Sequence, residues 1–201
     1  MTVFYKVMRR VVGGTASLFF RRKDIGKENI PDKGGFILCC NHTHFMDVFF
    51  LVMAMGKHQI NFMAKQELFR NKLAGWFFRK MGAFPVIRGS AQAEEGINTG
   101  EDVLRSGKVM GIFPEGTRSR DGRPKKAKSG IALIANDTGA PILPAAIYYE
   151  GKLGLFKKIT VRFGEMIPPE AVKLEENNRQ ELRRVSTLIM DKITALWEEG
   201  Y

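Results

Sequence analysis

The chain has 201 residues, of which 44% are hydrophobic and 26% are charged, the proportions of a folded globular domain. This composition excludes a disordered, collagen-like or disulfide-rich chain. Lysine and arginine number 32 against 21 aspartates and glutamates, so the formal net charge is +11. Such an excess of cations indicates an anionic partner, namely nucleic acid, a lipid headgroup surface or a phosphorylated substrate.

The positive charge is concentrated in three segments of the chain. Residues 1–33, 65–88 and 118–128 each carry a net charge of +5, so the remainder is slightly acidic. This clustering predicts a directed electrostatic surface, although runs of charge also occur on simple solvated faces.

Residues 1–33 are predicted to form a basic amphipathic segment that lies on a membrane surface. At helical spacing one side carries Phe4, Val7, Met8, Val11 and Leu18, and the other carries Lys6, Arg9, Arg10 and Gly13. A helix packed on the domain core is the alternative, and a signal peptide fits less well because arginines follow the short apolar run. The longest apolar run elsewhere, 48–56, is shorter than the ~20 residues that span a bilayer. The sequence therefore predicts no transmembrane helix.

From residue 34 onward, strand and helix patterns alternate along the chain. The first half is predicted as a strand at 34–40, a helix that Asn41 caps and that runs to about 55, a strand at 60–65, a helix at 68–82, a strand at 83–88 and a helix at 91–106. The second half is predicted as strands at 108–113, 141–149 and 157–164, and helices at 129–139 and 178–199. This order predicts an α/β domain over 34–201 with a mostly parallel central sheet flanked by helices.

The two cysteines, Cys39 and Cys40, are neighbours in the first predicted strand. A disulfide between adjacent residues is strained and rare, so we interpret both as small side chains inside a strand, in a reducing compartment.

The first candidate site is the segment NHTHFMD, 41–47, which follows that strand. A histidine beside a carboxylate is the smallest general-base unit. In a regular helix His42 and Asp47 would lie ~140° apart, so they can meet only if His42 precedes the helix and Asp47 begins it. A metal site that adds His44 and His58, and a purely local structural role, are the alternatives.

The second candidate site is FPEGTRSRDG, 113–122, which also follows a strand. Gly116, Thr117 and Arg118 suit a phosphate or an oxyanion through backbone N–H groups, a hydroxyl and a guanidinium. Glu115 cannot attract an anion, so we expect it to orient the loop through Arg118 or a backbone amide, or to contact a substrate hydroxyl. An ordinary turn is the alternative. The glycine patterns of the common nucleotide-binding loops and the serine nucleophile elbow are absent from the sequence.

Four blocks, in this order and spacing, resemble the glycerolipid acyltransferase family, in particular the bacterial 1-acyl-sn-glycerol-3-phosphate acyltransferases. They are the His-x4-Asp block at 42–47, GAFPVIRG at 82–89, FPEGTRS at 113–119 and the proline-containing strand at 142–147. The resemblance covers about residues 34–149. It implies a glycerol-3-phosphate acyltransferase-like fold with an N-terminal helical extension.

The resemblance also implies a reaction and a set of site residues. A fatty acyl group would move from acyl-CoA or acyl carrier protein to the free hydroxyl of 1-acyl-sn-glycerol-3-phosphate, giving phosphatidic acid, without a metal or other cofactor. His42 would be the general base, and Asp47 would hold its tautomer. The residues implied to hold the acceptor are Arg88, Glu115, Gly116, Thr117 and Arg118, with Lys65 assisting. Arg88 and Arg118 would bind the phosphate.

Further expectations concern partners and location. We expect a peripheral enzyme that binds anionic lipid on the cytoplasmic face of the inner membrane. Another lysolipid acceptor is the alternative substrate, and a basic nucleic-acid-binding protein is the alternative outside the enzymes, although no nucleic-acid-binding motif is present. His44 departs from the small polar residue expected within the first block, so its role stays open.

Overall fold

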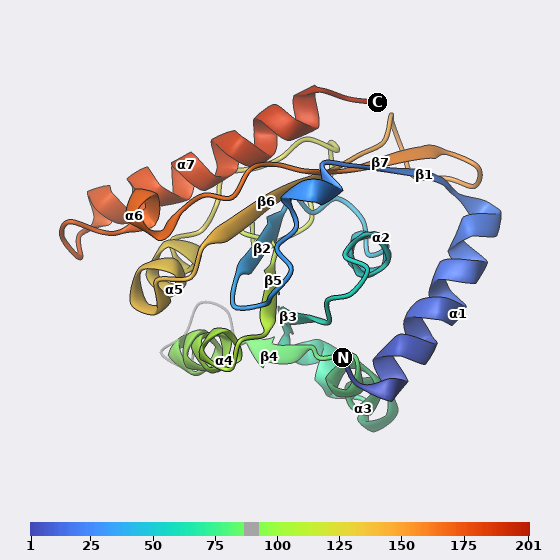
Figure 1. Cartoon of the computed structure of the whole chain (residues 1–201), viewed down its shortest axis with the longest axis horizontal. Helices are drawn as coiled ribbons and strands as arrows, with labels where there is room; N and C mark the ends of the chain where they lie inside the picture. The colour runs from blue at the N-terminus through green and yellow to red at the C-terminus, as the bar shows by residue number, and fades with distance from the viewer. Residues whose placement is uncertain (87–92) are drawn as a thin grey trace.

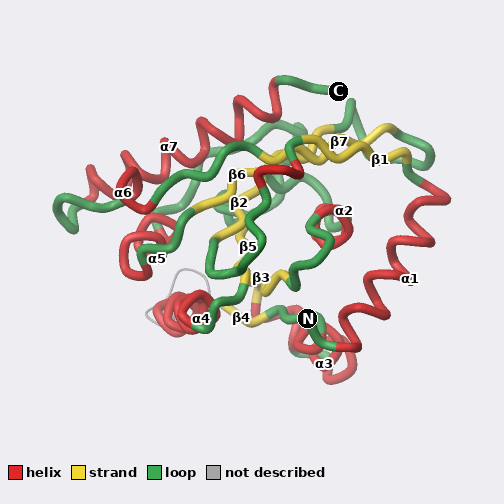
Figure 2. The backbone as a smooth tube through the Cα atoms, in the orientation of Figure 1, coloured by secondary structure: helices red, strands yellow, loops and turns green. Residues whose placement is uncertain are grey.

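The computed structural model describes residues 1–86 and 93–201, and its centre is a seven-stranded sheet with the strand order β1-β7-β6-β2-β5-β3-β4 (Figures 1 and 2). The strands are β1 (Arg21–Ile25), β2 (Ile37–Cys40), β3 (Ile60–Lys65), β4 (Phe84–Val86), β5 (Val109–Ile112), β6 (Ile142–Tyr148) and β7 (Lys158–Phe163). The predicted α/β fold is confirmed.

Most of the sheet is parallel, as predicted. β2 pairs in parallel with β5 and β6, and β3 pairs in parallel with β5 and β4. These five strands therefore end at one edge of the sheet, which is the edge where α/β proteins place their sites. The exceptions are β7, which runs antiparallel to β6, and β1, which pairs with β7.

Helices cover both faces of the sheet (Figure 1). One face carries α1 (Val3–Phe19) and α2 (Asp47–Ala54), and the other carries α4 (Ala93–Arg105), α5 (Gly130–Thr138), the short α6 (Pro169–Val172) and α7 (Arg179–Glu198). α3 (Lys72–Lys80) lies beside the start of α1, where Phe4 makes an edge-to-face contact with Trp76. Two 3-10 turns, η1 (Lys27–Asn29) and η2 (Gln66–Phe69), complete the fold.

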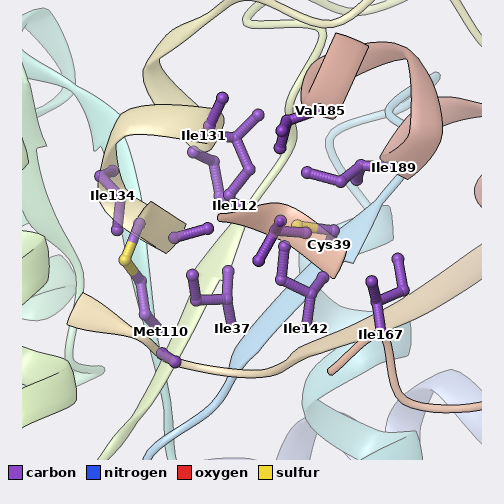
Figure 3. Packing of buried hydrophobic residues seen from close by; sticks show 14 of the residues in the cluster. Ile37, Cys39, Met110, Ile112, Ile131, Ile134, Ile142, Ile167, Val185 and Ile189 are labelled. Atoms are coloured by element: carbon purple, nitrogen blue, oxygen red, sulfur yellow. The ribbon is translucent and has the colours of Figure 1, made fainter. Parts of the chain in front are cut away.

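Alternate residues of the buried strands enter two separate cores. Ile37 and Cys39 join the core beneath α5 and α7, whose side chains Figure 3 shows, whereas Leu38 and Cys40 join the core beneath α2. The adjacent cysteines therefore point to opposite faces of the sheet, and both are free and fully buried. The interpretation of these cysteines as strand-interior side chains is confirmed, and burial raises the pKa of both thiols.

The N-terminal helix combines features of both alternatives. α1 packs on the domain through Tyr5 and Ala16, which are buried, and leaves Val7, Val11 and Leu18 exposed. Within the described part of the chain, no helix is both long and apolar enough to cross a bilayer.

Several predicted boundaries were wrong for identifiable reasons. Asn41 does not cap a helix, because α2 begins only at Asp47 and the Asn41 side chain bonds instead to the backbone of Ile147. The helix predicted at 68–82 starts late, because Asn71 accepts hydrogen bonds from two amides and caps α3. The segment that forms β1 was not predicted as a strand. Four of its five residues are charged, and all five are exposed or half-buried, so the sequence shows no apolar strand pattern there.

Candidate active site

The two candidate blocks meet at the carboxyl edge of the sheet, where β2 and β5 end side by side. His42 lies in the loop before α2, and Asp47 is the first residue of that helix. The Nδ1 atom of His42 lies 2.9 Å from Oδ2 of Asp47. This is the arrangement that the helix geometry required for the two side chains to meet.

Asp47 is held rigidly by the loop it faces. Its side chain is fully buried, and Oδ2 also accepts hydrogen bonds from the backbone N–H groups of Thr43 at 2.7 Å and His44 at 2.8 Å. The second oxygen, Oδ1, is buried without a hydrogen-bond partner among the described residues. A carboxylate fixed in this way holds the imidazole of His42 in a defined orientation.

The FPEGTRS loop holds the backbone of His42 from both sides. The N–H of His42 donates to Oε1 of Glu115 at 3.0 Å, and its carbonyl accepts from the N–H of Ser119 at 2.7 Å. The ring of Phe113 stacks on the imidazole with centroids 4.0 Å apart and planes 16° apart. With Nδ1 directed at Asp47, the other nitrogen, Nε2, makes no hydrogen bond to any residue that the structure describes.

Glu115 binds a backbone amide, which is one of the roles considered from the sequence. Only 4% of its surface is exposed, and burial raises its pKa to about 7. Its second oxygen, Oε2, is buried without a partner among the described residues. The carboxyl group therefore acts on His42 through the backbone rather than as an exposed ligand.

Gly116, Thr117 and Arg118 form the exposed turn of this loop. Gly116 has a φ of +72°, a conformation that favours glycine, and a Cβ there would lie 3.0 Å from the Lys128 side chain. Thr117 and Arg118 are exposed. Arg118 is therefore open to solvent on the loop whose next residue, Ser119, bonds to the His42 carbonyl.

The remaining predicted site residues are less closely tied to His42. Lys65 ends β3 at the same edge of the sheet, but its ammonium is 2.9 Å from a carboxylate oxygen of Glu67. Arg88 lies outside the described residues. The burial of His44 lowers its pKa, and its Nδ1 accepts a hydrogen bond from the backbone of Met46 at 3.2 Å.

Two contributions to the site were missed from the sequence. The Thr43 hydroxyl lies 2.6 Å from the hydroxyl of Tyr149, whose pKa is raised to about 12 by burial. The Asn41 amide pairs with both backbone groups of Ile147, which ties the loop to β6. A polar residue directly after a fully apolar strand is the only signal that marks Asn41.

The geometry also bears on the metal alternative. His58 precedes β3, at the opposite edge of the sheet from His42, and its Nε2 bonds to the carbonyl of Pro31 at 2.7 Å. In the parts of the chain that the structure covers, no three histidine, cysteine or acidic side chains are grouped as a metal site.

Comparison with known proteins identifies the family. A family model described as Acyltransferase matches residues 21–148. The chain belongs to the acyltransferase family. It is 41% identical over 139 residues to the 1-acyl-sn-glycerol-3-phosphate acyltransferase of Bacillus subtilis, a match that covers 68% of this chain and 67% of that protein. The expected enzyme class, an O-acyltransferase, is thereby confirmed.

Other members support the same assignment. The 1-acyl-sn-glycerol-3-phosphate acyltransferase of Streptococcus pneumoniae is 30% identical over 179 residues, covering 86% of this chain and 64% of that protein. The crystal structure of the Thermotoga maritima 1-acyl-sn-glycerophosphate acyltransferase, PlsC, superposes with a TM-score of 0.74 at 25% identity. That superposition covers 96% of this chain and 79% of the other, so the predicted acyltransferase fold is confirmed.

Proposed function

We propose that this acyltransferase converts 1-acyl-sn-glycerol-3-phosphate to phosphatidic acid, using His42 as a general base. The observation that carries the proposal is the contact between His42 Nδ1 and the buried carboxylate of Asp47 at 2.9 Å. The names of the Bacillus and Streptococcus relatives support the choice of acceptor.

The chemical steps follow from this pair. The Nε2 atom of His42 takes the proton of the acceptor hydroxyl as its oxygen attacks the carbonyl carbon of an acyl thioester. The new C–O bond forms, the C–S bond breaks, and the imidazolium returns the proton to the departing thiolate. Asp47 holds the tautomer and stabilises the imidazolium. Cys39 and Cys40 are buried strand residues, so the acyl group passes to the acceptor without an acyl-cysteine intermediate.

The exposed turn after β5 would bind the acceptor phosphate. Arg118 presents a guanidinium that has no ion-pair partner among the described residues, and a guanidinium matches phosphate geometry. Thr117 adds an exposed hydroxyl beside it. Arg88 remains a second proposed phosphate ligand on the strength of the family resemblance.

The same proposal includes a membrane surface. Val3, Val7 and Val11 on α1, and Leu73 and Trp76 on α3, are all at least half exposed. The two helices meet where Phe4 contacts Trp76 at 5.5 Å and Phe77 at 6.1 Å, so their exposed apolar side chains form one surface. We define these five exposed residues as the α1–α3 surface. Lys6 lies exposed beside it, and its ammonium group suits the headgroups of anionic lipids.

A substrate panel tests the proposal. Purified protein would be incubated with lysophosphatidic acid, other lysophospholipids and monoacylglycerol, each with acyl-CoA and with acyl carrier protein, and the products identified by mass. We expect phosphatidic acid from lysophosphatidic acid with at least one of the donors. A stronger product from another lysolipid would identify that lipid as the acceptor, and no ester product from any pair would contradict the proposed reaction.

A further inference from the structure

A cavity of about 460 Å³ lies outside the candidate active site, between α1, the start of β1 and α2. Its walls combine three arginines with aromatic and thioether side chains. Figure 1 shows α1 passing α2 before the chain turns into β1, which brings these three elements together. None of the residues that line the cavity belongs to the predicted catalytic or acceptor-binding set.

The cationic side of the cavity is incompletely paired. The Nε atom of Arg9 is buried and has no hydrogen-bond partner among the described residues. Neither Arg9 nor Arg21 has an ion-pair partner there, whereas Arg22 binds Asp24 at 2.8 Å. A buried guanidinium donor without an acceptor is costly, so a ligand that supplied anionic oxygens at this position would be favoured.

The other side of the cavity is apolar. Phe20 and Phe50 form an edge-to-face pair with centroids 5.4 Å apart, and Met53 lines the cavity from the next turn of α2. Guanidinium groups opposite an apolar wall suit a molecule that has an anionic head and a hydrocarbon part. A small inorganic anion would leave this wall without a partner.

We propose that this cavity binds one anionic glycerophospholipid, with its phosphate on Arg9 and Arg21 and the start of an acyl chain against Phe20 and Met53. The proposal rests on the proposed membrane-surface function, since α1 also carries exposed residues of the α1–α3 surface. The site is separate from the reacting atoms, because neither His42 nor Asp47 lines the cavity, which contacts α2 only through Phe50 and Met53. It would hold a membrane lipid rather than the acceptor.

Two adjacent arginines provide a matched test. Arg9 lines the cavity, whereas Arg10 is exposed on the same helix and does not line it. Arg9→Gln and Arg10→Gln remove the same charge from nearly the same place. The probe is dihexanoyl phosphatidylglycerol below its micellar concentration, measured by calorimetric titration, because it is neither the proposed acceptor nor its product. We expect one saturable site, weakened about tenfold or more by Arg9→Gln and little changed by Arg10→Gln.

Two adjacent glycines test the volume of the cavity independently of charge. A Cβ at Gly13 would lie 3.7 Å from the Met53 sulfur, so the leucine of Gly13→Leu would occupy the cavity. A Cβ at Gly14 would meet nothing within 4 Å. We expect Gly13→Leu to abolish binding of the probe and Gly14→Leu to preserve it, with circular dichroism used to verify that each variant is folded.

The outcomes separate this proposal from the proposed function. Equal weakening by Arg9→Gln and Arg10→Gln, or no saturable binding by the wild-type chain, would overturn the lipid site even if acyl transfer proceeds normally. Displacement of the probe by an equal concentration of inorganic phosphate would also overturn it, because the cavity would then be an anion site. Selective loss in Arg9→Gln and Gly13→Leu would support the site even if no acyl transfer were found.

Discussion

The backbone N–H of His42 donates a hydrogen bond of 3.0 Å to Oε1 of Glu115, a residue 73 positions later in the chain. This bond joins the His-x4-Asp block to the FPEGTRS block across the neighbouring strands β2 and β5. Glu115 is therefore a positioning residue, because it contacts the backbone of the loop that carries the proposed general base.

The first prediction concerns the pH dependence of stability. Burial raises the pKa of Glu115 from 4.5 to about 7. Between these values the folded protein holds a proton that the unfolded chain releases, so the contribution of Glu115 to stability is lost as the pH rises through this window. The variant Glu115→Gln cannot titrate. Its free energy of unfolding relative to wild type should increase by about 1–3 kcal/mol between about pH 4.5 and about pH 8.

Urea unfolding at several pH values measures this difference directly. Other titrating groups cancel, because both proteins carry them. A wild-type minus variant difference that stays constant across the range would show that the pKa of Glu115 is not raised in the folded protein.

The second prediction concerns the proposed general base. His42→Ala should lower kcat for acyl transfer by about 10²–10⁴-fold, because the acceptor hydroxyl loses its proton acceptor. The side chain is partly exposed and stacks on Phe113, so the fold should survive the change. Steady-state kinetics and thermal unfolding measure the two effects separately. Near-normal turnover by the folded variant would rule out His42 as the base.

The third prediction separates the two roles of Asp47. Asp47→Asn keeps an oxygen that can accept from the N–H groups of Thr43 and His44, but it removes the negative charge beside His42. We expect kcat to fall by about 10²-fold or more while the variant remains folded. The split between kcat and KM gives the decisive readout, since a carboxylate that supports the imidazole acts on the chemical step, and its removal should leave KM for both substrates little changed. An unchanged kcat would assign Asp47 a purely structural role.

The fourth prediction uses two exposed arginines of one loop. Arg118→Gln should raise KM for lysophosphatidic acid about 10- to 100-fold, because a charged hydrogen bond to the phosphate is lost. KM for the acyl donor should change less. The control is Arg120→Gln, which removes an equal exposed charge two residues away. An identical effect of the two substitutions would mean that the loop attracts the substrate only through its general charge.

The fifth prediction concerns the α1–α3 surface. Trp76 is 51% exposed, so Trp76→Glu should leave the fold intact and weaken binding to anionic vesicles at low salt by about tenfold or more. Thr187→Glu adds the same charge to the exposed side of α7, on the opposite face of the sheet, and should bind nearly as wild type. Vesicle co-sedimentation measures both variants. Failure of the wild-type chain to bind such vesicles would contradict the membrane proposal.

The elements that could be predicted from the sequence are those with a strong local signal. Gly139 ends α5 with a φ of +60°. The apolar residues of α7 recur at helical spacing, and Val185 and Ile189 on that face are buried. The spacing of His42 and Asp47 also required a loop before α2, which the structure contains. Such features depend on turn residues and on apolar periodicity, both of which are visible within one short segment of the sequence.

Features that depend on distant partners could not be predicted. β1 becomes a strand only because β7 pairs with it, and the antiparallel direction of β7 is set by the connection from β6. The role of Glu115 was narrowed to a few alternatives, but the backbone of His42 as its partner follows only from the adjacency of β2 and β5. Local propensity carries no information about either pairing.

The side-chain amide of Asn41 extends the pairing of β2 with β6 by two hydrogen bonds, since it bonds to both the N–H and the carbonyl of Ile147. The residue before the proposed base is therefore hydrogen-bonded directly to the sheet. The backbone of His42 is thereby fixed at the end of the sheet, so each acceptor must reach the imidazole there. Under the proposed function, headgroup discrimination would fall to exposed side chains such as Thr117 and Arg118, and a change of acceptor is best sought at those two positions.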